Sequence, residues 1–137
     1  MLQLQNNPYQ TYQNQSIQTA APDRLLIMLF EGALRFLREA MDAIDKRDYT
    51  TANNKNVRVQ DIVNELIITL NHEVGGEISK NLQSIYQYLL ERLVEANIKK
   101  DRAVLEEVYA HLKELHEAFK EAAQIVRSEK GRSGTLA

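Results

Sequence analysis

The distribution of proline is the sequence feature that most constrains the fold of this chain. Proline breaks a helix interior because it lacks the backbone N–H and its ring clashes with the preceding turn. The 137 residues include two prolines, Pro8 and Pro22, so 23–137 contains none. Over that stretch apolar residues recur at steps of three and four, the spacing of one face of a helix. We therefore predict an all-α protein whose first helix begins at Pro22, since proline suits a first helical turn.

Four amphipathic helices joined by short connections are expected. Gly75 and Gly76 mark the turn before the third helix, and Asp101 is a suitable N-cap for the fourth. Short connections force neighbouring helices to run antiparallel, so the sequence predicts an antiparallel up-down four-helix bundle. The predicted bounds are 22–47, 51–71 and 77–98, followed by a last helix from Asp101 to about 128.

The chain then divides into three parts. An N-terminal arm occupies 1–21, the four-helix bundle 22–128, and a tail with several glycines and serines 129–137, where we expect disorder. Apolar spacing also predicts which residues of the last two helices face the core. For the third helix these are Ile78, Leu82, Ile85, Leu89, Leu93 and Ala96, and for the fourth Leu105, Val108, Leu112, Leu115, Phe119, Ala122 and Val126.

The arm carries no charge, although 26% of the whole chain is charged. It is rich in Gln and Asn and includes Tyr9 and Tyr12. Solvated tails usually carry charge, so this segment is expected to lie against a surface. The first helix begins with six consecutive apolar residues, 25–30, which cover every face of a helix. That helix needs cover on more than one side, and the arm is the nearest cover in the sequence.

Composition excludes several classes of function. The chain has no cysteine, which excludes a disulfide framework and a thiolate metal site. Its net charge is -2 and its isoelectric point about 5.9, so no bulk attraction to nucleic acid or an anionic membrane is expected. No apolar run approaches the length of a membrane span, and the N-terminus does not resemble a secretory signal. We therefore expect a soluble cytoplasmic protein.

The sequence offers no pattern that points to catalysis. A di-iron site in a bundle needs Glu-x-x-His pairs, and no acidic residue stands three positions before His72, His111 or His116. Nucleophile-elbow, P-loop and dinucleotide motifs do not occur. We expect no cofactor, no metal and no enzyme activity, so a bundle enzyme or metal carrier is the weakest alternative.

Apolar and aromatic residues exceed what one core-facing stripe can hold. Tyr86, Tyr88, Leu89 and Leu90 fall in one turn of the third helix, so some of them must face away from the core, and Ile68 lies off the main stripe of the second helix. Two interpretations remain open and are compatible. These residues either border the core and meet the arm, or form a groove for a partner helix.

Several segments in order resemble the flagellar secretion chaperone family FliS. They are Asn7-Pro8-Tyr9-Gln10-Thr11-Tyr12, Ala21-Pro22-Asp23-Arg24-Leu25-Leu26, Leu29-Phe30-Glu31-Gly32-Ala33, Gly75-Gly76-Glu77-Ile78 and Leu93-Val94-Glu95-Ala96-Asn97. The resemblance covers about 7–126. It implies an antiparallel bundle in the cytoplasm that binds the disordered C-terminal segment of flagellin, prevents premature polymerisation and aids delivery to the type III export apparatus.

The resemblance also implies which residues contact the partner. The arm, which the family uses as a movable cover, contributes Tyr9, Tyr12 and Asn14, and the groove contributes Ile68, Tyr86, Tyr88, Leu89, Ala96 and Asn97. The export gate and flagellar regulators are further expected partners, and the chain is expected to be a monomer or weak homodimer. The alternative is a self-associating regulatory or structural bundle without a flagellin client.

Overall fold

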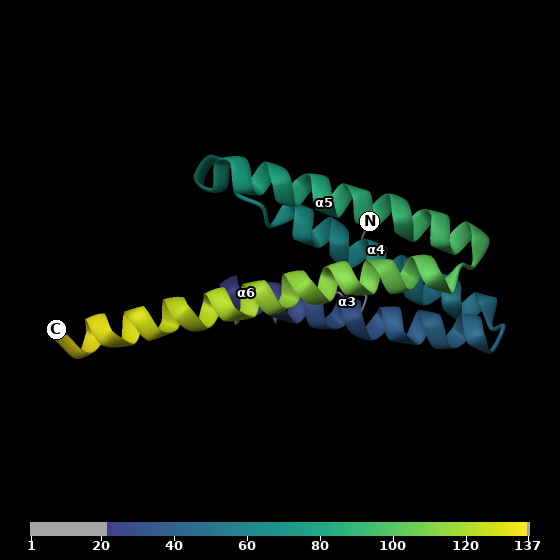
Figure 1. Ribbon diagram of the computed structural model, residues 1–137, viewed down its shortest axis with the longest axis horizontal. Coiled ribbons are helices and arrows are strands. Elements are labelled where there is room, and N and C mark those ends of the chain that lie inside the picture. Colours follow the sequence, from purple (N-terminus) through teal and green to yellow (C-terminus); the bar gives the residue numbers. More distant parts are fainter. Residues whose placement is uncertain (1–21, 137) are drawn as a thin grey trace, which may run out of the picture.

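The structure, a computed structural model, describes residues 22–136, with side chains described for 23–129. This part of the chain forms four helices and no strand (Figure 1), so the predicted all-α fold is confirmed. The predicted arm lies outside the described residues. The helices are α3 (Pro22–Asp45), α4 (Tyr49–Ile68), α5 (His72–Lys99) and α6 (Arg102–Leu136).

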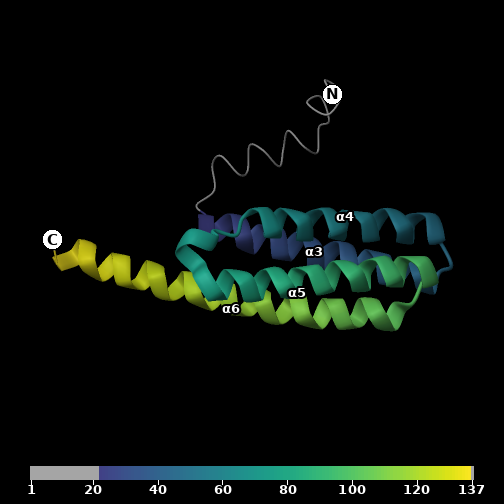
Figure 2. The same ribbon diagram turned by 90° about the horizontal axis from the view of Figure 1, so that it is seen from above.

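The four helices form a ring in which each one packs against two neighbours. α3 lies between α4 and α6, and α5 closes the ring by contacting the same two helices from the other side (Figure 2). The contact between α3 and α4 is the most extensive and that between α5 and α6 the least. Successive helices run antiparallel, as the short connections predict. The C-terminal part of α6 projects beyond the other three helices (Figures 1 and 2).

Polar side chains define where three of the helices begin. The Asp48 carboxylate accepts a hydrogen bond from the Thr51 backbone N–H at 3.2 Å, which caps α4. The Asn71 side chain accepts from the N–H of Val74 at 3.2 Å, which caps α5. Asp101 accepts from the Ala103 N–H at 3.0 Å, so the predicted cap of α6 is confirmed. Each cap satisfies a backbone donor that has no partner within its own helix.

The predicted turn at Gly75 and Gly76 is a kink inside α5. The helix is already formed from His72, but its backbone leaves helical geometry at Gly76, where φ is 53° and ψ is -120°. A positive φ costs glycine little because it has no Cβ. The long straight part of α5 therefore starts at Glu77, where the sequence predicts the helix to begin.

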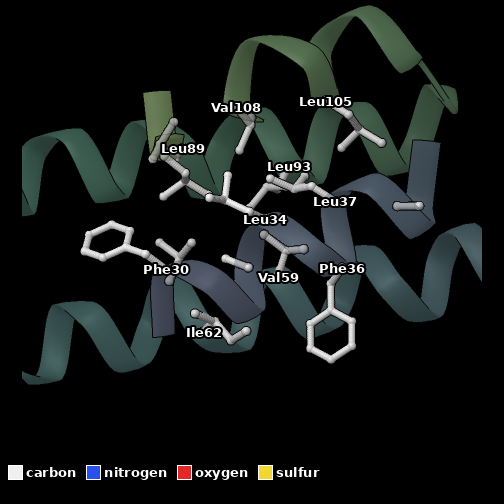
Figure 3. Close-up of a cluster of buried hydrophobic side chains, with 14 of the residues drawn as sticks. Phe30, Leu34, Phe36, Leu37, Val59, Ile62, Leu89, Leu93, Leu105 and Val108 are labelled. Carbon is white, nitrogen blue, oxygen red and sulfur yellow. The ribbon is translucent and has the colours of Figure 1, made fainter. Parts of the chain in front are cut away.

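The core runs along the centre of the ring. Phe30, Leu37, Leu93 and Val108 are fully buried and come from three different helices, and Val59 adds the fourth (Figure 3). Full burial of one such side chain contributes about 1.5–3 kcal/mol. Small residues on the inner face of α3, Ala33 and Ala40 among them, fit its close packing against α4 and α6.

The predicted inner face of α5 is wrong at two positions. Ile78 is 70% exposed and Ile85 is also exposed, whereas Ser79 and Tyr86 are buried. The core-facing positions 79, 82, 86, 89, 93 and 96 alternate steps of three and four without interruption. Tyr86 takes the core-facing position that the sequence predicts for Ile85. Burial of the ring raises the pKa of the Tyr86 hydroxyl to about 12.

The inner face of α6 agrees with the prediction from Leu105 to Phe119 and then departs from it. Ala123 is buried, whereas Ala122 and Val126 are exposed. Arg127 of α6 donates a hydrogen bond to Asp23 in the first turn of α3 at 3.1 Å, so the bundle ends at this level. Val126 is exposed because α6 has no neighbour to cover it there.

The backbone of α6 remains helical to Leu136, beyond the predicted end of the bundle at residue 128. The expected disorder of the tail stays a prediction. No helix between residues 22 and 136 has the length and apolar character needed to cross a membrane.

Candidate partner-binding surface

Three of the predicted groove residues belong to the core. Tyr86, Leu89 and Ala96 all lie on the inner face of α5, and the most exposed of them, Tyr86, has 1% of its surface accessible. In this conformation a partner chain cannot touch them without opening the bundle. The three residues share one face of α5, but that face is turned toward the core of the bundle and not toward the solvent.

The other three predicted groove residues are accessible but do not share one face. Ile68, at the end of α4, is 73% exposed. Asn97 is half-buried and donates a hydrogen bond to Asn53 of α4 at 2.7 Å. Tyr88 points toward α6. Tyr9, Tyr12 and Asn14 lie outside the described residues, so their contacts stay predictions.

The side of the ring between α5 and α6 contains an apolar groove of about 470 Å³. It lies where two helices pack least extensively, and Ser84 and Ala118 fill little of the space between them. Ile85 and Leu115 contribute aliphatic side chains to the lining of the groove, and Tyr88 contributes an aromatic ring. The lining residues are Ser84, Ile85, Tyr88, His111, Glu114, Leu115 and Ala118.

A group of polar side chains closes one end of this groove. The Tyr88 hydroxyl donates a hydrogen bond to the Glu107 carboxylate at 2.5 Å, and Arg92 donates to the other carboxylate oxygen at 2.9 Å. Arg92 also pairs with Glu95. The His111 ring meets the Tyr88 ring edge-on, with 6.2 Å between centroids. These contacts fix the rotamer of Tyr88 and thereby the shape of the groove at this end.

These hydrogen bonds account for the titration behaviour of the group. The Tyr88 hydroxyl, followed by Arg92 and His111, lowers the pKa of the Glu107 carboxyl. The same bond raises the pKa of Tyr88, because the phenol proton is held by the carboxylate. Glu107 in turn raises the pKa of Arg92. All three pKa shifts favour an ionised Glu107, a neutral Tyr88 and a charged Arg92, which are the states that form these hydrogen bonds.

A second apolar surface lies at the end of the bundle where α3 begins. It collects the end of α4, the start of α5 and the projecting part of α6 (Figure 2). Exposed aliphatic side chains at one end of a bundle are candidates for binding another chain. We call it the aliphatic end, and its members are Ile68, Val74, Ile78, Ile125 and Val126.

The sequence analysis does not identify Val74, Ile85 and Ile125 as exposed apolar residues of the surface. Periodicity predicts a core position for Ile85 because this residue fits one of two overlapping apolar stripes on α5, but the side chain is exposed. A signal was available: Ile78 and Ile85 are seven residues apart and form a second apolar row beside the one through Tyr86. Among the described side chains, no group of three or more His, Asp or Glu could hold a metal ion.

Four antiparallel helices around one core, with an apolar groove and an aliphatic end, define a helical-bundle protein whose surface suits binding of another chain. Residues 5–126 match the family model described as flagellar protein FliS. The predicted resemblance is thereby confirmed, and the chain belongs to the FliS family.

Three relatives illustrate this membership, and each is named a flagellar secretion chaperone FliS. The relative from Bacillus subtilis (strain 168) is 39% identical over 131 residues, which cover 96% of this chain and 97% of the relative. The relative from Salmonella typhimurium is 34% identical over 107 residues, with 77% and 79% covered. The relative from Campylobacter jejuni is 34% identical over 119 residues, with 86% and 93% covered.

Proposed function

We propose that this chain is a cytoplasmic export chaperone for flagellin. It binds the disordered C-terminal segment of flagellin, prevents premature polymerisation and aids delivery to the flagellar type III export apparatus. The observation that carries the proposal is the match of residues 5–126 to the FliS family, whose relatives are named flagellar secretion chaperones. The function is binding and transport, without catalysis or a cofactor.

The exposed aliphatic surface supports a disordered client. A disordered segment loses conformational freedom when it binds, and this cost must be offset by burial of apolar area. Ile68, Val74 and Ile78 at the aliphatic end and Ile85 in the groove offer such area. A client that buries several of these side chains gains about 1.5–3 kcal/mol for each one fully covered.

The positions of the accessible residues favour a client that wraps around the bundle. Ile68, Tyr88 and Asn97 lie on different parts of α4 and α5. An extended segment that contacts all three must cross more than one face. Within this proposal the buried residues Tyr86, Leu89 and Ala96 act indirectly, by setting the shape of the surface above them.

The N-terminal arm is proposed to cover apolar surface until the client arrives. Tyr9, Tyr12 and Asn14 are its expected contact residues. The uncharged sequence of 1–21 supports this role, as does its attachment at Pro22, beside the aliphatic end. The export gate and flagellar regulators are proposed as further partners of a chain that is a monomer or weak homodimer.

Isothermal titration calorimetry with the C-terminal segment of flagellin tests the proposed function. Two variants on the outer side of α4 form a matched pair, since Ile68→Asp and Asn64→Asp each add one negative charge at an exposed position. Only the first removes an exposed aliphatic side chain. We expect roughly tenfold weaker binding for Ile68→Asp, the loss typical of one important apolar contact, and near-normal binding for Asn64→Asp. No heat of binding with the unaltered chain contradicts the proposal.

The aliphatic end also supports the alternative of a self-associating bundle without a client. Light scattering over a range of protein concentrations, with and without the flagellin segment, separates the two functions. A chaperone forms a complex whose mass includes the segment. A self-associating bundle gains mass with its own concentration and ignores the segment.

A further inference from the structure

Three cationic side chains surround one aromatic ring where α3 packs against α4. The ring belongs to Phe36, which is 7% exposed and points away from the centre of the core (Figure 3). The guanidinium carbon of Arg35 lies 4.9 Å from the ring centroid, the Nζ of Lys55 5.4 Å and the guanidinium carbon of Arg58 5.8 Å. At these distances the π face of a ring attracts a positive charge. We call the three cations the cationic cluster.

The carboxylates near the cationic cluster neutralise only part of its charge. The cations share one ring, so no two of them are much more than one Debye length apart, which is about 10 Å at 0.1 M salt, and they repel each other. Glu39 binds Lys55 at 3.1 Å. Glu31, four residues before Arg35, lies 3.5 Å from the Nε2 of His116 on α6. Among residues 23–129 no carboxylate forms an ion pair with Arg35.

Packing beneath the cationic cluster fixes its position. Phe36 belongs to the core, and the contact between α3 and α4 is the most extensive in the bundle. Arg35 and Arg58 are exposed above the ring. A guanidinium group presents parallel N–H donors that match the two oxygens of a carboxylate, and it stacks on an aromatic face without losing these donors. The cluster is therefore suited to binding carboxylate groups at the surface.

We propose that the cationic cluster binds an acidic segment of a partner protein. Carboxylates of that segment pair with Arg35 and Arg58, and Lys55 adds attraction at longer range. Charge complementarity identifies the occupant. The arm at 1–21 has no carboxylate and cannot supply it, and the net charge of -2 disfavours nucleic acid. The site lies between α3 and α4, away from the groove between α5 and α6, and does not depend on the proposed binding of flagellin.

Two short synthetic peptides test the charge requirement. Both are flexible chains of Gly and Ser without apolar side chains, so that apolar surfaces of the bundle do not contribute to binding. One carries several Glu, and the other has Gln at the same places. Fluorescence anisotropy at low salt should show the Glu peptide binding roughly fivefold more tightly, the effect of two exposed ion pairs. Equal affinities, or no binding of the Glu peptide, would overturn the proposal.

Variants of the full chain locate the binding. The double variant Arg35→Gln and Arg58→Gln removes both guanidinium groups and should abolish discrimination between the peptides. The matched control, Arg24→Gln and Lys113→Gln, removes two exposed positive charges outside the cationic cluster and should retain it. Circular dichroism confirms that each variant is folded. Discrimination that survives the first double variant, or is lost equally in both, overturns the proposed site.

Two further measurements separate this proposal from its neighbours. Calorimetry with the flagellin segment tests the chaperone function independently, so a chain that binds flagellin but not the Glu peptide overturns only the acidic partner. A single-stranded DNA oligonucleotide with the same net charge as the Glu peptide tests nucleic acid as the occupant, and we expect it to bind more weakly. Tighter binding that is lost in Arg35→Gln and Arg58→Gln would assign the cationic cluster to nucleic acid and overturn the acidic partner.

Discussion

At the scale of single residues, one buried amide connects α4 to α5. Asn56 has 1% of its surface exposed, and its side chain donates a hydrogen bond to the Leu93 carbonyl at 3.0 Å. Its amide oxygen accepts one from Gln60 at 2.7 Å. A buried polar group of this kind is tolerated because it is hydrogen-bonded, and it favours one register between the two helices.

Removing this amide should destabilise the bundle. Asn56→Ala deletes both hydrogen bonds and leaves a small cavity, so we expect a loss of about 1–3 kcal/mol in the free energy of unfolding. Urea denaturation followed by circular dichroism measures it. Asn53→Ala is the matched control, because Asn53 is exposed and bonds only Asn97 at the surface. Equal losses in the two variants would show that burial of Asn56 is unimportant.

The pKa shift of Glu107 predicts a dependence of stability on pH. The folded state lowers this pKa from its ordinary value of 4.5, so the stabilising contribution is complete well above pH 4.5. It is lost as the pH falls through the lowered folded-state value. Glu107→Gln should therefore be less stable than the unaltered chain at pH 7, and the difference in urea midpoint should shrink toward pH 3. A difference that grows on acidification would contradict this assignment.

At the scale of helices, the two glycines Gly32 and Gly76 have opposite roles. Gly76 holds a positive φ with open space where a Cβ would lie, so its need for glycine comes from the backbone alone. Gly32 lies in the middle of α3, and an added Cβ would meet the Ile62 methyl at 3.4 Å, an ordinary contact. The first glycine is required by conformation, whereas the second lowers the helix propensity of α3.

Alanine substitution should separate these roles. Gly76→Ala forces a side chain into a strained conformation and should destabilise the chain by about 1–3 kcal/mol. Gly32→Ala should leave stability unchanged or raise it by up to about 1 kcal/mol. Thermal unfolding by calorimetry measures both. A destabilised Gly32→Ala with an unaffected Gly76→Ala would contradict the described kink.

Apolar periodicity predicts most of this fold but cannot choose between overlapping stripes. On α5 both Ile85 and Tyr86 fit a helical repeat through Leu89 and Leu93, and only packing against the other helices decides between them. The projection of α6 depends on where α3 begins, so periodicity within α6 could not reveal that Val126 is exposed. Of the predicted groove residues that the structure describes, Tyr88 alone lines the groove between α5 and α6. Periodicity could not predict the other lining residues, because the groove forms where two helices pack least extensively.

At the scale of the whole molecule, the arm and the aliphatic end are expected to act together. If 1–17 covers apolar surface, then deleting it should raise the mass measured by light scattering at high protein concentration. The apparent affinity for the flagellin segment should increase, because the client no longer competes with the cover. Tyr9→Ser with Tyr12→Ser, at unchanged length, should produce the same two effects. A deletion that alters neither measurement would contradict the role of the arm.

The contact between the first and last helices has a consequence for how the chain is made. Asp23 and Arg127 bond each other although 104 residues separate them, and α6 supplies one whole side of the ring. During synthesis the sides of α3 and α5 that face α6 therefore stay uncovered until α6 has left the ribosome. A chain that stops before Leu105 exposes part of side chains such as Leu37 and Leu93, so the bundle closes only after α6 has been synthesised.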